Sequence, residues 1–203
     1  MGVMKKIILL LVMAFLLLPA CKETKKLELT SQKSQNFANG PVKIQLAKLT
    51  SVSDVIKLDE TTPSDFRFDI NGKNVSFKEF IKGKNVILNF WATWCPPCKA
   101  ELPNLVAISK EYKSKNWIVI GIMLEREKYD IQKTKVTEFL TDKAIEYPNI
   151  IGTQETINKL TDAYGGISGI PTTFFINTSG KIYNKQVGSM EKAGFEELMN
   201  IIK

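Results

Sequence analysis

The sequence of 203 residues contains no histidine and only three cysteines. Without histidine it lacks the commonest ligand for zinc, copper and haem iron, and also the commonest general base. A four-ligand zinc site would need two more cysteines or histidines than a single cysteine pair supplies, so zinc is disfavoured. Any chemistry must therefore rest on thiols, carboxylates, hydroxyls or lysines, and we expect no metal or other cofactor.

Acidic residues are scarce near the N-terminus, and this explains most of the net charge of +7. Residues 22–58 carry seven lysines against three acidic residues, whereas residues 59–203 carry nineteen Lys or Arg against eighteen Asp or Glu. The globular part is nearly neutral, so we expect no nucleic-acid partner. The basic segment suits either a solvated linker or a tether beside an anionic membrane surface.

A lysine pair precedes an unbroken apolar run over residues 7–18. This run is too short to span a bilayer, but it matches the hydrophobic part of a secretory signal. The four residues that end at Cys21 resemble a bacterial lipobox, in which cleavage leaves the cysteine first and a lipid is attached to its sulfur. We predict a signal peptide over residues 1–20 and lipidation at Cys21; a plain signal peptide or an uncleaved anchor is the alternative.

The lipidated cysteine and a polar tether are predicted over residues 21–58, ahead of a globular domain over residues 59–203. Lys, Ser, Gln and Asn dominate the first half of this tether, which cannot bury much apolar surface. Alternating apolar and polar residues near Ile44 favour a strand there. The pattern leaves open whether residues 42–58 pack on the domain or belong to the linker.

Strand and helix signals alternate through the globular part. Asn71-Gly72 between two short strand patterns predicts a hairpin, and Ser76 with Glu79 predicts the start of a short helix. Strands alternating with helices, then a second hairpin and a last helix, predict an α/β fold with a mixed sheet. The expected strands are 85–91, 117–124, 172–176 and 181–187; the expected helices begin after Cys95 and cover about 130–141, 155–164 and 191–202.

A Cys-x-x-Cys pair, Cys95 and Cys98, lies where a buried strand gives way to a helix. A sulfur at a helix N-terminus faces free N–H groups and the positive end of the dipole, which favour the thiolate. A structural disulfide over so short a loop would add little stability. The context therefore favours redox activity, with Cys95 as the exposed nucleophile and Cys98 as the more buried resolving thiol.

Two motifs carry a family resemblance. The stretch NFWATWCPPCKAELP over residues 89–103 resembles the active-site segment of the TlpA/ResA branch of thioredoxin-like proteins, and GIPTTFFIN over 169–177 resembles the loop with that superfamily's cis-proline. The resemblance covers roughly residues 62–203. It implies a thioredoxin-like fold, a central mixed sheet flanked by helices with an N-terminal β-hairpin extension. It also implies a cis Ile170–Pro171 peptide facing the two sulfurs.

Several residues near the dithiol are expected to shape the site. Glu101 matches a glutamate of the ResA type, and a carboxylate there would raise the thiol pKa and accept the Cys98 proton; a solvated surface glutamate is the alternative. Pro96 and Pro97 have no N–H, so a Cys95 thiolate should be less stabilised and the couple more reducing. Trp94 is expected to form part of a substrate platform, or else to be half-buried packing.

The leading hypothesis is a membrane-anchored thiol-disulfide oxidoreductase of the cell envelope that faces the extracytoplasmic side. The resemblance implies a protein-disulfide reductase acting on exported proteins, apocytochrome c among them, with electrons from a membrane thiol carrier of the CcdA/DsbD kind. Alternatives are a disulfide oxidase or isomerase, and a thioredoxin-fold binding subunit of an envelope complex in which the thiols are incidental. A peroxiredoxin is disfavoured, since its reactive thiol normally lies outside a Cys-x-x-Cys pair.

Overall fold

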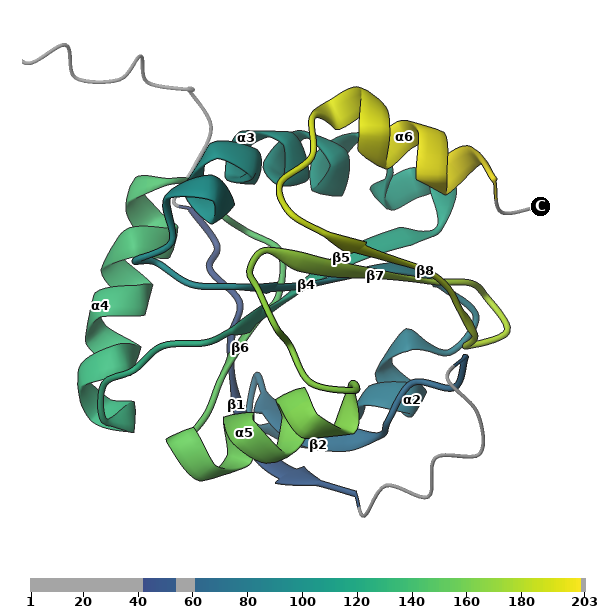
Figure 1. Cartoon of the computed structure of the whole chain (residues 1–203). Coiled ribbons are helices and arrows are strands. Elements are labelled where there is room, and N and C mark those ends of the chain that lie inside the picture. Colours follow the sequence, from purple (N-terminus) through teal and green to yellow (C-terminus); the bar gives the residue numbers. More distant parts are fainter. Residues whose placement is uncertain (1–41, 54–60, 202–203) are drawn as a thin grey trace, which may run out of the picture. The chain divides into compact units, whose positions relative to one another are not determined.

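The computed structural model describes residues 42–53 and 61–201. The predicted signal peptide, Cys21 and most of the predicted tether lie outside the described residues. Within the described part, eight strands form one mixed sheet in the order β3-β2-β1-β6-β5-β4-β7-β8 (Figure 1). Strands β1, β6, β5 and β4 run parallel to one another, and the remaining neighbours pair antiparallel. The strands are β1 Leu46–Val52, β2 Phe66–Ile70, β3 Lys73–Ser76, β4 Asn85–Trp91, β5 Trp117–Met123, β6 Asn149–Ile151, β7 Thr172–Ile176 and β8 Ile182–Val187.

Helices cover both faces of the sheet (Figure 1). Helices α2 and α5 pack on one face and α3, α4 and α6 on the other, in two separate apolar clusters. Side chains of β4 alternate between these clusters, because successive residues of a strand point to opposite faces. The helices are α2 Phe77–Ile81, α3 Pro96–Glu111, α4 Tyr129–Asp142, α5 Gln154–Ala163 and α6 Lys192–Asn200, with a short 3-10 turn η1 at Lys113–Lys115.

The hairpin and the short helix that follow residue 61 match their sequence signals. Asn71 and Gly72 have φ values of 51° and 75°, the left-handed conformations that a two-residue hairpin turn of strands β2 and β3 requires. The Ser76 hydroxyl then accepts a hydrogen bond from the Glu79 N–H at 3.4 Å and caps α2. Both predictions from local sequence are confirmed.

Of residues 42–58, whose place was left open, the structure describes residues 42–53, and strand β1 lies among them. Residues Leu46–Val52 lie inside the sheet, between the hairpin strand β2 and the short strand β6. Ala47 and Leu49 are buried, whereas Lys48 between them is exposed. The folded part therefore extends ahead of residue 59, where the domain was expected to begin. Strand β1 also starts later than the pattern near Ile44 indicated.

Candidate active site

The cysteine pair lies at the carboxyl end of the central strand β4. This strand is flanked by β5 and β7 and buried along nearly its whole length, which fixes the point where the chain leaves the sheet. Helix α3 begins five residues after the end of β4, and Cys95 is its N-cap with extended backbone. The Cys95 sulfur accepts a hydrogen bond from the Cys98 N–H at 3.2 Å. Pro96 and Pro97 occupy the first two helical positions, so this is the first backbone donor that the helix offers to the sulfur.

The two cysteines form a disulfide with Cα atoms 5.3 Å apart. The sequence predicted an exposed Cys95 and a buried Cys98, but the structure buries both, at 3% and 0% exposure. Cys98 is the more buried of the two, as expected, but Cys95 is not exposed. Its sulfur lies 3.6 Å from the carbonyl oxygen of Ile170, on a loop far away in the sequence. The sulfur thus packs against that loop, and only a small part of Cys95 is accessible to a partner.

The Ile170–Pro171 peptide is cis, as the resemblance implied. Pro171 is buried and directly precedes strand β7, which pairs antiparallel with β4. Because neighbouring strands keep their ends together, this pairing brings the loop beside the start of α3. The predicted site residues Trp94, Cys95, Cys98, Ile170 and Pro171 thus belong to two segments that meet at one edge of the sheet.

Glu101 is buried, at 1% exposure, and not a solvated surface residue. Its carboxylate accepts hydrogen bonds from the Asn89 side-chain amide at 2.8 Å and from the Met190 N–H at 3.2 Å. Burial raises the pKa of Glu101 to about 7, and the two hydrogen bonds oppose that rise. The carboxyl therefore titrates near neutral pH, one helical turn from Cys98.

Asn89 connects this carboxyl to the sheet. Its amide nitrogen also donates to the Thr173 hydroxyl at 3.0 Å, while its amide oxygen has no partner among the described residues. Asn89 and Thr173 face each other in the β4–β7 pair and are both fully buried. The strand after the cis-proline, the central strand and helix α3 are therefore joined by one polar chain within the apolar interior.

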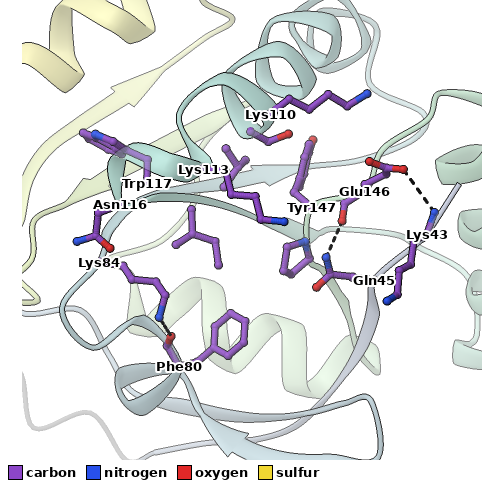
Figure 2. Close-up of a pocket in the computed structure, with 14 residues that line it drawn as sticks. Lys43, Gln45, Phe80, Lys84, Lys110, Lys113, Asn116, Trp117, Glu146 and Tyr147 are labelled. Carbon is purple, nitrogen blue, oxygen red and sulfur yellow. Dashed lines mark hydrogen bonds between the residues drawn. The ribbon is translucent and has the colours of Figure 1, made fainter. Parts of the chain in front are cut away.

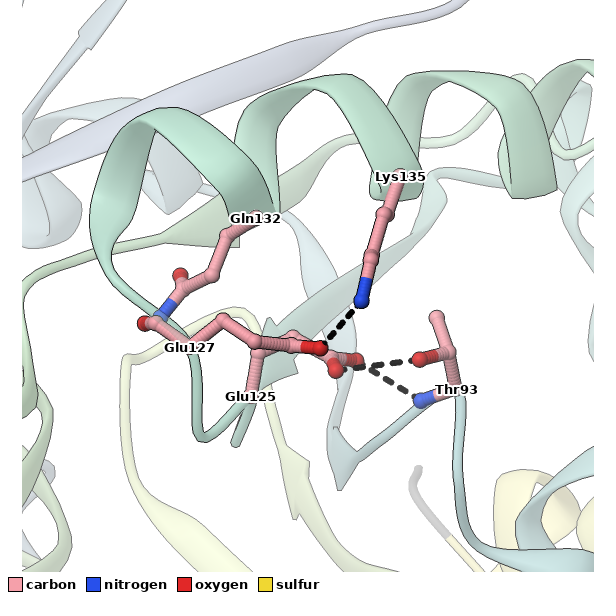
Figure 3. A network of polar contacts seen from close by, with 5 residues as sticks. All are labelled: Thr93, Glu125, Glu127, Gln132 and Lys135. Atoms are coloured by element: carbon pink, nitrogen blue, oxygen red, sulfur yellow. Dashed lines mark hydrogen bonds and ion pairs between the residues drawn. The ribbon is translucent and has the colours of Figure 1, made fainter.

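A second carboxyl, Glu125, supports the loop ahead of Cys95 (Figure 3). It accepts hydrogen bonds from the Thr93 N–H at 2.7 Å and from the Thr93 hydroxyl at 3.0 Å. Glu125 is nearly fully buried, and burial is the main cause that raises its pKa. Sequence reasoning missed it, although a signal existed. Glu125 follows the buried strand β5, and adjacent parallel strands end at the same edge of a sheet.

The loop between β5 and α4, which carries Glu125, also places a cation over Trp94. The Arg126 guanidinium lies 4.0 Å from the centroid of the Trp94 ring, within the range of a cation–π contact. Glu127, the next residue, pairs with Lys135 of α4 at 2.5 Å, and its carbonyl accepts a hydrogen bond from Gln132 (Figure 3). The loop is thus fastened on both sides of Arg126. Trp94 is 42% exposed, so the rim beside Cys95 presents an aromatic ring and a positive charge.

Within residues 42–53 and 61–201, no group of three or more histidines, cysteines, aspartates or glutamates is placed to hold a metal ion. In the same ranges no helix is both long enough and apolar enough to cross a membrane.

The Redoxin family matches residues 57–202 of the chain. The thiol-disulfide oxidoreductase ResA of Bacillus subtilis (strain 168) is 34% identical over 135 residues, which cover 66% of this chain and 70% of that protein. Similar solved structures include the following two. A thioredoxin-family thiol:disulfide interchange protein from Chlorobium tepidum TLS is 32% identical with a TM-score of 0.59, and the match covers 73% of this chain and 98% of that one. The exposed lipoprotein thioredoxin Etrx1 of Streptococcus pneumoniae strain TIGR4 is 29% identical with a TM-score of 0.53, over 68% and 99%. The expected thioredoxin-like fold is confirmed.

Proposed function

The chain belongs to the Redoxin family and is a thiol-disulfide oxidoreductase of the ResA type; on that premise we propose that it is a lipid-anchored, extracytoplasmic reductase of disulfides in exported proteins. The observation that carries the direction of electron flow is the proline pair. It leaves the Cys98 N–H as the first helical donor to the Cys95 sulfur. A thiolate with few donors is stabilised little, which favours release of electrons and formation of the disulfide.

The proposed reaction begins with both cysteines reduced. The Cys95 thiolate attacks one sulfur of the partner's disulfide, a mixed disulfide forms, and the other partner sulfur leaves as a thiolate that takes up a proton. The Cys98 thiolate then attacks the Cys95 sulfur and releases the second partner thiol. Two electrons and two protons pass to the partner, and the Cys95–Cys98 disulfide remains.

Glu101 is the proposed proton acceptor for Cys98. Its pKa of about 7 means that the carboxyl exchanges a proton at the pH where the resolving thiol must lose one. Its bonds to Asn89 and Met190 fix it on the buried side of α3. The half-buried Ile170 and the exposed Trp94 with Arg126 form the proposed surface for the partner chain.

The proposed location rests on the segments ahead of the domain, and the proposed partners rest on the similarity to the ResA type. The proposed signal peptide over residues 1–20, the lipidated Cys21 and the polar tether behind it would hold the domain at the membrane. The similarity to an exposed lipoprotein thioredoxin supports this. The proposed partners are disulfide-bearing exported proteins, apocytochrome c among them, and a membrane thiol carrier of the CcdA/DsbD type as electron donor.

The test is the reduction potential of the Cys95–Cys98 couple in the full chain, equilibrated against glutathione and dithiothreitol buffers. A value of about −270 mV or lower supports a reductase. A value near about −120 mV contradicts it and makes the chain a disulfide donor. Replacement of Cys95 by Ser distinguishes a reductase or a disulfide donor from a binding subunit. Only a binding subunit would function equally well without the thiol.

A further inference from the structure

A second site lies at the opposite end of the sheet from the dithiol. A pocket of about 550 Å³ opens beside the first residues of β5, between the C-terminal half of α3 and helix α2 (Figure 2). Its lining includes Lys84, which precedes β4, and Trp117, which begins β5. Cys95 follows the other end of β4. Seven residues of extended strand, about 23 Å, therefore separate the pocket from the sulfurs.

The pocket is strongly basic. Four lysines line it, Lys43, Lys84, Lys110 and Lys113, against the single acid Glu146. None of the four forms an ion pair with a described acidic residue. The Lys84 ammonium donates to the carbonyl of Phe80 at 3.3 Å (Figure 2). Lys43, Lys110 and Lys113 are exposed and Lys84 is half-buried, so the rim of the pocket presents an excess of positive charge that would attract an anion.

The inner lining of the pocket is apolar and aromatic. Phe80 and Trp117 contribute rings to it, together with Ile118, Val119 and Pro148. Tyr147 also belongs to the lining, but its hydroxyl is buried in the protein interior and does not face the cavity. The pocket thus combines positive charge at its rim with apolar surface inside, a chemistry that suits an amphiphilic anion.

The described part of the chain begins at this pocket. Lys43 and Gln45, the second and fourth described residues, belong to its lining. About twenty residues separate this point from Cys21. A chain of that length spans at most about 70 Å, so an anchor at Cys21 would hold this end of the domain within that distance of the membrane.

We propose that the pocket binds the phosphate headgroup of an anionic phospholipid in the membrane that carries the anchor. This rests on the proposed lipid anchor for its location, but not on the proposed direction of electron flow. With the headgroup bound, the lysine end of the sheet faces the membrane and Cys95 faces away from it, toward exported proteins.

The experiment measures how fast each lysine of the full chain reacts with a water-soluble amine acetylating reagent, by mass spectrometry. The chain is reconstituted in vesicles of phosphatidylcholine alone, of phosphatidylcholine with phosphatidylglycerol, or of phosphatidylcholine with inorganic phosphate in the buffer. We expect phosphatidylglycerol to slow acetylation at Lys84, Lys110 and Lys113 by about five-fold or more, as for roughly 1 kcal/mol per lysine at an anionic surface. Exposed lysines elsewhere, such as Lys133, should react equally in all three.

Two variants serve as a matched pair. Exchange of Lys84, Lys110 and Lys113 for Gln should abolish the protection of Lys43 by phosphatidylglycerol. Exchange of three exposed lysines outside the pocket, at positions 73, 128 and 133, removes the same charge and should leave that protection intact. Both variants should keep the reductase activity of the parent, which shows that they are folded.

Each outcome decides the proposal. Equal acetylation with and without phosphatidylglycerol overturns it, and so does equal protection by inorganic phosphate, which would identify a soluble anion instead. Loss of protection in the control variant as well would indicate a general charge effect and also overturn it. If the chain is not retained on vesicles, the anchor is refuted, while the same labelling with short-chain phosphatidylglycerol in solution still decides whether the pocket binds the headgroup.

Discussion

Exchange of Glu101 for Gln removes one titrating proton from the interior and keeps the shape of the side chain. Glu101 is 1% exposed, and its pKa rises from 4.5 to about 7 because burial disfavours the charged form. In the unfolded chain the same carboxyl ionises near its ordinary pKa. Between these two values the folded protein keeps a proton that the unfolded chain has lost, so stability must fall as the pH rises.

The size of this fall follows from the two pKa values. Each unit of difference is worth about 1.4 kcal/mol, so the shift from 4.5 to about 7 amounts to about 3 kcal/mol. The full stability is present below pH 4.5, and the loss is complete above pH 7. A glutamine has no proton to lose, so the variant avoids this fall. A small loss that does not depend on pH is expected in the variant, because glutamine has one acceptor oxygen for two donors, the Asn89 amide and the Met190 N–H.

The assay is urea unfolding of the disulfide-bonded chain at several pH values from 4.5 to 8, followed by tryptophan fluorescence without reductant. Keeping the disulfide intact removes the titration of the two thiols from the comparison. Over this range the parent should lose about 3 kcal/mol more unfolding free energy than the Glu101→Gln variant. Exchange of the exposed Glu138 for Gln is the control and should leave the pH dependence of the parent unchanged. Parallel curves for the parent and Glu101→Gln would refute the raised pKa.

Three further exchanges test the rest of the site and the sheet beneath it. Pro96→Gly restores an N–H near the Cys95 sulfur and should raise the reduction potential by about 30 mV, as one added charged hydrogen bond requires; an unchanged or lower potential in a dithiothreitol titration contradicts this. Glu125→Ala leaves the Thr93 N–H without its partner and should lower the unfolding free energy by about 2 kcal/mol, measured in urea; a loss within error would mean that water replaces the carboxylate. Gly121→Ala would bring a methyl carbon to 2.2 Å from a side-chain oxygen of β6 and should cost about 2 kcal/mol or more in thermal unfolding. The same exchange at Gly194 in helix α6, whose nearest neighbour would be at 3.8 Å, is its control and should be neutral or slightly stabilising, because alanine favours a helix more than glycine does.

Local signals explain why most of the fold could be predicted from the sequence. The Asn71-Gly72 turn, the Ser76 cap and the apolar run of β4 each depend on neighbours within a few residues. Strand β6 escaped prediction because it has only three residues, and its place is set by pairing with β1 and β5. Strand β1 is an internal strand of the sheet for the same non-local reason.

In the candidate site, too, some features depend on local sequence and others on contacts between distant segments. The positions of the two cysteines and of the cis-proline were predictable from short motifs. The burial of Cys95 was not, because its cover comes from Ile170, which is 75 residues away in the sequence. Nor did the sequence indicate that Asn89 would donate to Glu101, since that bond joins a strand to a helix through the packed interior. Contacts of this kind depend on how elements pack, and a single sequence carries little information about packing.

The two ends of the sheet impose opposite requirements on the proposed cycle. A headgroup held at the lysine pocket directs Cys95 away from the membrane, which favours reaction with exported proteins but separates the sulfurs from an electron donor in the bilayer. If both proposals hold, the domain would have to release the headgroup and turn before each re-reduction. Because three of the four lysines are exposed and Lys84 is half-buried, the pocket can supply only a shallow electrostatic contact. Weak binding of this kind permits release, so stronger anchoring at the pocket would slow re-reduction by a membrane donor without changing the rate of the first thiol exchange.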